Sequence, residues 1–230
     1  MFYIDPLYII LVMPAVIFAM IAQIGVKTTY AKYSKISSSR GITGEQAARA
    51  VLSANGVYGV RFERVRGELT DHFDPKTNTI RLSDGVGSSN SVAAIGVAAH
   101  EAGHAVQYAK NYAPIKLRSA IVPITQIGSS LSMPLVLIGL IFNIFELAMI
   151  GVIFFGLAVV FQLVTLPVEF NASRRAMAAL KSEYLLEGDE VKGARKTLSA
   201  AAMTYVAALF VSLMQFLRLF IMVAGGRRRD

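Results

Sequence analysis

The 230-residue sequence contains no cysteine and no tryptophan, and it has only three histidines. Without cysteine the chain can form neither disulfide bonds nor thiolate metal sites, so any bound metal must be held by nitrogen and oxygen ligands. Charged residues are also scarce, at 17%, whereas 54% of the residues are hydrophobic. This balance is too apolar for an ordinary soluble domain of this length and indicates a membrane protein.

Four stretches with little or no charge are long enough to cross a bilayer, which requires about 20 apolar residues in a helix. They are residues 6–26, 120–142, 147–166 and 200–224. The first stretch lacks the basic start and short apolar centre of a cleaved signal peptide, so we interpret it as an uncleaved anchor. The second and third are close enough to predict a helical hairpin. The fourth is interrupted by Gln215 and Arg218, although an arginine near a helix end can reach the membrane surface.

The sequence therefore predicts one mainly α-helical domain, residues 1–230, with about four transmembrane helices. The polar segments 27–119 and 167–199 lie on the same side of the membrane in this arrangement. Both are rich in lysine and arginine next to the spans, and the bias of such residues toward the cytoplasm places this side in the cytoplasm. The tail Arg227–Arg229 opposes the assignment, unless the fourth stretch does not fully cross.

The net charge of +8 raises the question of a nucleic-acid partner. The basic residues, however, are concentrated beside the apolar stretches, where they set the topology and contact anionic lipid headgroups. No motif that combines aromatic and basic residues is present, so we expect no nucleic-acid binding. The expected partners are membrane lipid and a substrate.

Two helices are predicted in the first polar segment. Thr43 and Gln46 have the spacing of a capping box, which predicts a short helix over residues 45–54. The serines within 88–91 can cap a longer helix over residues 92–108, whose alanines and glycines allow close packing.

Between these helices the pattern changes to that of a small β-hairpin or edge strand. Residues 58–65 and 79–82 have β-like sequences, and residues 74–78 between them are typical of a turn. The segment 78–83 could add an extended peptide as a further strand, which gives backbone recognition with little sequence preference. The alternative is an ordinary covered edge.

The second predicted helix carries the pattern HExxH, formed by His100, Glu101 and His104. Two histidines four residues apart lie on one face of a helix, about one turn apart, so both imidazoles can reach the same zinc ion. Glu101 lies beside them and can take a proton from a zinc-activated water molecule. This combination is typical of zinc peptidases.

A catalytic zinc ion usually has three protein ligands, so a third ligand is needed. His72 is the remaining histidine and is one candidate. The other is Glu169, which the predicted topology places on the same side of the membrane as the HExxH helix. Pro167 can begin a new helical turn that presents Glu169 near the membrane surface.

Three segments resemble the bacterial YugP-type neutral zinc metallopeptidases, and the resemblance covers nearly the whole chain. They are residues 71–75 (DHFDP), 97–105 (VAAHEAGHA) and 169–176 (EFNASRRA). The resemblance implies a multi-pass, zinc-dependent protein of the bacterial cell membrane. A more distant similarity is to the HtpX and CAAX prenyl endopeptidase group, in which an aspartate commonly follows the ligand glutamate by four positions. This chain has Ser173 there.

By this resemblance, one zinc ion per chain is bound by His100, His104 and Glu169, and Glu101 is the general base. His72 then has two possible roles. It can stabilise the oxyanion that forms during hydrolysis, or it can stabilise its own turn through a neighbouring aspartate, Asp71 or Asp74.

The function predicted from the sequence is hydrolysis of peptide bonds in membrane or membrane-adjacent proteins by a zinc metalloendopeptidase. A zinc-binding membrane scaffold or chaperone-like protein without turnover is the alternative, but such a protein has no need of Glu101. A transporter is disfavoured because the second and third spans carry no charge. The sequence specifies neither the substrate nor the oligomeric state.

Overall fold

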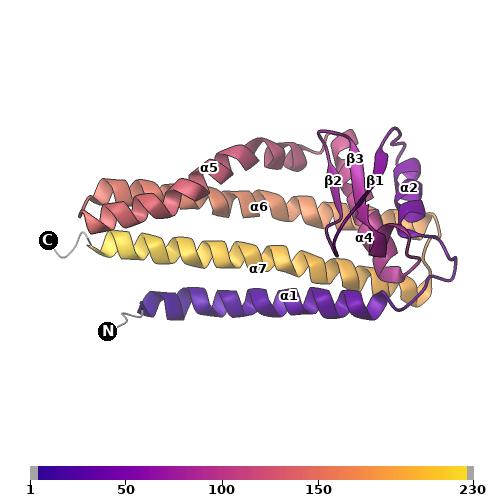
Figure 1. Ribbon diagram of the computed structural model, residues 1–230, viewed down its shortest axis with the longest axis horizontal. Helices are drawn as coiled ribbons and strands as arrows, with labels where there is room; N and C mark the ends of the chain where they lie inside the picture. The colour runs from indigo at the N-terminus through magenta and orange to yellow at the C-terminus, as the bar shows by residue number, and fades with distance from the viewer. Residues whose placement is uncertain (1–4, 227–230) are drawn as a thin grey trace. The chain divides into compact units, whose positions relative to one another are not determined.

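The computed structural model describes residues 5–226, which are mainly α-helical (Figure 1). Four helices are long and apolar enough to cross a membrane, as predicted. They are a π-helical turn Tyr8–Val12 that continues as α1 (Met13–Tyr33), α5 (Ala113–Ile141), α6 (Phe145–Ser182) and α7 (Gly188–Gly226). All four extend beyond the predicted apolar stretches, because the helices continue into polar sequence. The tail Arg227–Arg229 lies outside the described residues.

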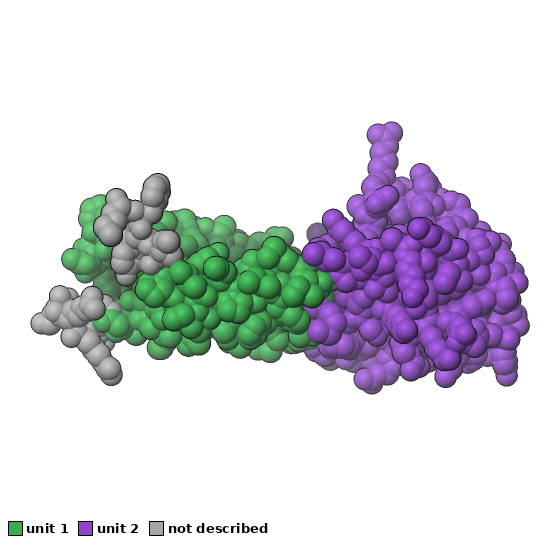
Figure 2. Space-filling model, turned by 90° about the horizontal axis from the view of Figure 1, so that it is seen from below, with its two compact units in different colours: residues 1–22, 117–166, 204–230 green, residues 23–116, 167–203 purple. Residues whose placement is uncertain are grey.

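The chain divides into two compact units, which Figure 2 distinguishes by colour. Unit 1 comprises residues 1–22, 117–166 and 204–230, and unit 2 comprises residues 23–116 and 167–203.

Unit 1 exposes large apolar side chains. Ile10, Ile127 and Ile153 are each more than 60% exposed, and they lie in the uncharged stretches 6–26, 120–142 and 147–166. Such a surface is unfavourable in water and favourable in lipid hydrocarbon, since every helical backbone group is already hydrogen-bonded. Unit 1 is therefore the membrane-spanning part of the protein.

Small residues bring α5 and α6 together within unit 1. A side chain on Gly139 would meet the backbone of Ala148, and one on Gly151 would meet the backbone of Ser132. Close approach through small residues is typical of helix pairs in membranes. Asn143, in the left-handed conformation (φ 55°), lies in the short turn between the two helices. The predicted helical hairpin is confirmed.

Arg218, the charge that interrupts the last apolar stretch, is paired in unit 1. Its Nε atom lies 2.6 Å from Oδ2 of Asp5, which precedes the first span, and its guanidinium group lies over the ring of Tyr8. The fourth helix therefore tolerates Arg218 through a direct ionic partner.

Unit 2 contains the helices α2 (Gly44–Ala54), α3 (Asp84–Gly87) and α4 (Val92–Ala109). The capping box of Thr43 and Gln46 is present, and the hydroxyl of Ser91 accepts a hydrogen bond from the Ala94 amide at the start of α4. Both predicted helices are confirmed. The helix α2 packs on α4, and their buried faces consist mainly of alanine and valine.

The sheet of unit 2 has three strands, β1 (Arg61–Val65), β2 (His72–Asp74) and β3 (Thr79–Ser83), in the order β1-β3-β2. The predicted turn joins β2 to β3 in an antiparallel hairpin, whereas β1 pairs parallel with β3. Because β3 is the central strand and is paired on both sides, the interpretation of segment 78–83 as a strand-addition edge is wrong. The buried side chains of Ile80 and Leu82 are consistent with a covered central strand.

Candidate active site

Four polar side chains are almost completely buried around α4 in unit 2. Glu101 and His104 are each 8% exposed, Glu169 is 2% exposed and Gln107 is fully buried. Buried polar groups are costly unless they have partners, so the contacts of these four side chains define the site.

His100, His104 and Glu169 form one compact group. Their potential ligand atoms all lie within 4.8 Å of one another, and the Nε2 atoms of His100 and His104 lie 3.2 and 3.5 Å from Oε2 of Glu169. Two imidazole nitrogens and a carboxylate oxygen are a donor set that fits zinc and leaves a coordination position open. These are the three side chains that the resemblance implied. Pro167, however, does not begin a new helical turn, because α6 runs through it without interruption.

Gly103 allows the two helices that carry this group to approach each other. A Cβ atom at position 103 would lie 2.6 Å from the carbonyl oxygen of Ala172, which is itself fully buried. Any other residue at position 103 would therefore push α4 and α6 apart. Glu169 lies one turn before Ala172 on α6, so this close contact brings its carboxylate within reach of both histidines.

Gln107 fixes the ring of His104. The Nε2 group of Gln107 donates to the carbonyl oxygen of Val168 at 2.8 Å and to Oδ1 of Asn171 at 3.0 Å. The amide oxygen of Gln107 therefore faces Nδ1 of His104, at 3.0 Å, and must accept a hydrogen bond from the Nδ1–H group. With its proton on Nδ1, His104 presents the lone pair of Nε2 toward Glu169, as a metal ligand requires.

Ser173 has the corresponding position beside His100. Its hydroxyl oxygen lies 3.0 Å from Nδ1 of His100, while Nε2 of the same ring faces Glu169. The position four residues after Glu169 therefore contacts a candidate ligand, although it carries a hydroxyl group where the HtpX group has a carboxylate.

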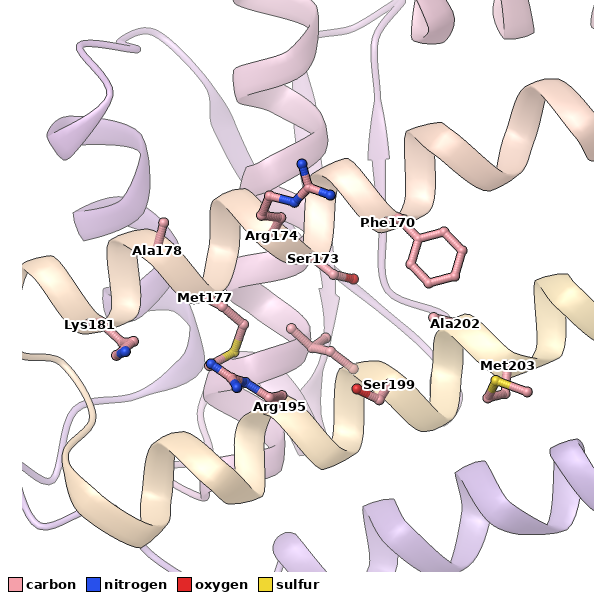
Figure 3. A pocket seen from close by; sticks show the side chains of 11 residues that line it. Phe170, Ser173, Arg174, Met177, Ala178, Lys181, Arg195, Ser199, Ala202 and Met203 are labelled. Carbon is pink, nitrogen blue, oxygen red and sulfur yellow. The ribbon is translucent and has the colours of Figure 1, made fainter.

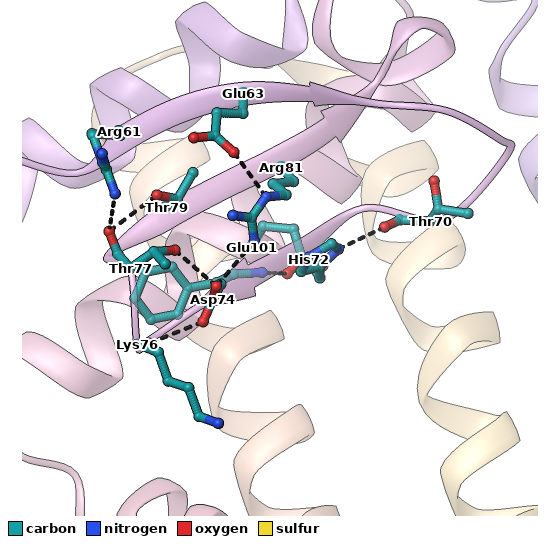
Figure 4. A network of polar contacts seen from close by, with 11 residues as sticks. Arg61, Glu63, Thr70, His72, Asp74, Lys76, Thr77, Thr79, Arg81 and Glu101 are labelled. Carbon is teal, nitrogen blue, oxygen red and sulfur yellow. Dashed lines mark hydrogen bonds and ion pairs between the residues drawn. The ribbon is translucent and has the colours of Figure 1, made fainter.

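Glu101 contacts the edge strand β2. Its Oε2 atom accepts a hydrogen bond from the backbone N–H of Phe73 at 3.0 Å (Figure 4). Burial raises the pKa of the Glu101 carboxyl group above its ordinary value, against the opposing effect of His100 and His104. The HExxH glutamate is thus anchored at one oxygen by a strand outside its own helix.

His72 lies outside the group of candidate metal ligands. Its side chain is exposed on β2, and its Nδ1 atom lies 2.9 Å from the carbonyl oxygen of Thr70. Among the described residues, neither Asp71 nor Asp74 forms a hydrogen bond with the His72 ring, although the Asp71 carboxylate interacts with it through charge. Asp71 instead accepts hydrogen bonds from Ser83, and Asp74 closes the β2–β3 turn.

The Asp74 carboxylate accepts hydrogen bonds from the Thr77 hydroxyl, the Arg81 side chain and the Lys76 amide (Figure 4). These interactions lower the pKa of Asp74 to about 2. Arg81 also pairs with Glu63 on β1, so this network connects all three strands through side chains. The strand that carries the Phe73 amide is therefore held in the sheet by side-chain contacts as well as by its backbone pairing with β3.

Together, the fold and the site define a membrane protein with an HExxH helix and a convergent glutamate. The chain belongs to the family described as "Putative neutral zinc metallopeptidase", whose model matches residues 8–224. It is 45% identical over 221 residues to the "Putative membrane protease YugP" of Bacillus subtilis (strain 168), an alignment that covers 96% of this chain and 98% of that protein. No solved structure matches the chain.

Proposed function

We propose that the protein is a zinc-dependent endopeptidase in which His100, His104 and Glu169 bind one zinc ion and Glu101 is the general base. The observation that carries this proposal is the convergence of the three ligand atoms beside a buried glutamate. Zinc bound in such a site supplies an acidified water molecule and polarises the carbonyl group of a substrate. The name of the family supports the same class of activity.

Glu101 has the environment of a proton carrier. The Phe73 amide occupies its Oε2 atom, so Oε1 remains to accept a proton from the attacking water and to deliver it to the leaving amine. Burial raises the pKa of this carboxyl group, which makes the carboxylate a stronger base. A purely structural zinc site would need no such residue, which argues against the scaffold alternative.

The proposed substrates are peptide bonds in membrane or membrane-adjacent proteins, cleaved on the cytoplasmic side of the bacterial cell membrane. Two features support this proposal. The helix α6 carries Glu169 shortly after its uncharged span, and the lysines and arginines beside the spans favour a cytoplasmic location of residues 27–119 and 167–199.

Metal content and peptide cleavage, measured on detergent-purified protein, test the proposal. We expect about one zinc ion in the wild type and in Glu101→Gln, and much less in Glu169→Ala. Glu101→Gln should lower kcat by about a thousandfold, because it retains the shape of the side chain but not the base. Glu146→Ala is the matched control for Glu169→Ala, because Glu146 is an exposed glutamate on the same helix, α6, and this variant should retain both zinc and activity.

Full zinc content in Glu169→Ala would contradict the ligand assignment. The absence of zinc from wild-type protein that was prepared without a chelator would contradict the peptidase proposal itself.

The role of His72 can be separated in the same experiment. Its Nδ1 atom faces a carbonyl oxygen and must donate to it, so only Nε2 can face a substrate oxygen. If His72 stabilises an oxyanion, His72→Phe should lower kcat by about a hundredfold with zinc content and KM unchanged. If it only stabilises the strand, His72→Phe should lower thermal stability and leave kcat near the wild-type value.

A further inference from the structure

An open groove lies between α6 and α7 in unit 2 (Figure 3). Its volume is about 570 Å³, and side chains from both helices line it. None of its lining residues is one of the three candidate zinc ligands. The groove therefore needs a separate explanation.

The charge of the groove has one sign. Arg174, Lys181 and Arg195 line it, and no aspartate or glutamate does. Within the described part of the chain, none of these three cations forms an ion pair, whereas Arg40, Arg81 and other basic residues of unit 2 do. Three unpaired cations around one groove favour an anionic ligand.

The polarity of the groove changes along the helices. Phe170 and Met203 form one end and are 45% and 41% exposed, and Lys181 and Arg195 lie toward the other end (Figure 3). The stretch from Phe170 to Lys181 extends roughly 16 Å along α6. At the apolar end, Phe170 follows the uncharged stretch 147–166 of α6, and Met203 lies at the start of the apolar stretch 200–224 of α7.

We propose that this groove binds an anionic phospholipid. The phosphate group would contact Arg195, whose guanidinium group suits phosphate oxygens, and Lys181 at the same end of the groove, with Arg174 as a further cation on α6. The first part of an acyl chain would lie along Phe170 and Met203. A free phosphate ion would use only the cationic end, and an acidic peptide would leave the exposed apolar end uncovered.

The groove also reaches the candidate active site. Ser173 lines it, and the hydroxyl group of Ser173 lies 3.0 Å from Nδ1 of His100. A bound lipid would restrict the Ser173 side chain and so favour one orientation of the His100 ring. This effect on activity rests on the proposed function, whereas lipid binding itself does not.

Native mass spectrometry of the detergent-purified full chain, titrated with phosphatidylglycerol or phosphatidylcholine, tests the proposal. The variant Arg174→Gln/Lys181→Gln/Arg195→Gln should bind phosphatidylglycerol about a hundredfold more weakly, at about fivefold for each cation. The control Lys32→Gln/Lys35→Gln/Lys196→Gln loses the same charge at positions that do not line the groove, and it should bind as the wild type does. Glu101→Gln should also bind normally, which separates lipid binding from peptidase activity.

Ser199→Trp provides a second test, because it fills the groove without removing a cation. It should weaken phosphatidylglycerol binding at unchanged zinc content and thermal stability. Equal losses in the two triple variants, or normal binding by Ser199→Trp, would overturn the proposal in favour of diffuse attraction to the surface. Displacement of the lipid by inorganic phosphate or by an acidic peptide at equal concentration, or equal binding of phosphatidylcholine, would overturn the assignment to an anionic lipid.

Discussion

Unit 2 buries ionisable and amide side chains, whereas unit 1 exposes large apolar ones, and each arrangement is unfavourable in water without further partners. In unit 2, Glu101, Gln107 and Glu169 are at most 8% exposed. In unit 1, Ile10 and Ile127 are more than 60% exposed. The partners differ accordingly, because unit 2 supplies its own hydrogen bonds and unit 1 depends on lipid.

This difference predicts how each unit responds to substitution. Gln107 makes three directed contacts, so a change of a single functional group in unit 2 disturbs several neighbours. A lipid-facing position of unit 1 only has to remain apolar. Zinc content should therefore be sensitive to small changes in unit 2 and insensitive to changes on the surface of unit 1.

The largest effect is expected for Gly103→Ala. Its methyl group would lie 2.6 Å from the carbonyl oxygen of Ala172, so α4 and α6 must separate and Glu169 must move away from the histidines. A displacement of about 1 Å can cost a hundredfold in activity, and we expect a loss of this size together with reduced zinc content. Gly25→Ala is the matched control, since nothing lies within 4 Å of that position in α1, and it should behave like the wild type or be slightly more stable.

Normal zinc content and activity in Gly103→Ala would show that the approach of α4 to α6 does not position the ligand group. The same loss in Gly25→Ala would attribute the effect to the helices in general and not to this contact.

The second prediction compares two glutamines. Gln107→Leu removes the acceptor for His104 Nδ1 and the donor to Val168, so zinc affinity should fall about 10- to 100-fold. Gln126→Leu replaces an exposed glutamine on α5 in unit 1 and should leave zinc affinity unchanged. Competition with a zinc-binding dye measures both. Equal zinc affinities for the two variants would contradict the expectation that zinc binding is more sensitive to substitutions in unit 2 than to substitutions on the surface of unit 1.

The membrane-spanning helices and the helix caps could be predicted from the sequence. A run of about 20 apolar residues shows in the local composition, and the Thr43 and Ser91 caps are short local patterns, so neither requires tertiary information. The order of the strands was not predictable in this way. The parallel pairing of β1 with β3 depends on the intervening strand β2, which has only three residues and too short a pattern to detect.

In the candidate site, too, local patterns were predictable from the sequence and contacts that depend on tertiary packing were not. His100 and His104 follow from helical spacing, and Glu169 was found through topology and resemblance. Gln107 was missed, although it lies three residues after His104 and so one helical turn further along. The Phe73 amide could not have been found, because a backbone group carries no mark in the sequence and its contact with Glu101 depends on tertiary packing.

The smallest effect is expected for the ion pair of unit 1, the exception to its apolar character. Asp5 and Arg218 have side chains that are 22% and 16% exposed, so a double-mutant cycle with Asp5→Asn and Arg218→Met should give a coupling of about 1 kcal/mol at neutral pH. Burial raises the pKa of Asp5, but hydrogen bonds from Arg218 and the Leu7 amide outweigh it and lower the pKa below the ordinary 3.8. The coupling should therefore be complete above that value and disappear as the pH falls below the lowered pKa. Unfolding in mixed detergent micelles measures it. Zinc content should not change in any of these variants, and a loss of zinc in Arg218→Met would show that the polar contact of unit 1 also supports the site in unit 2.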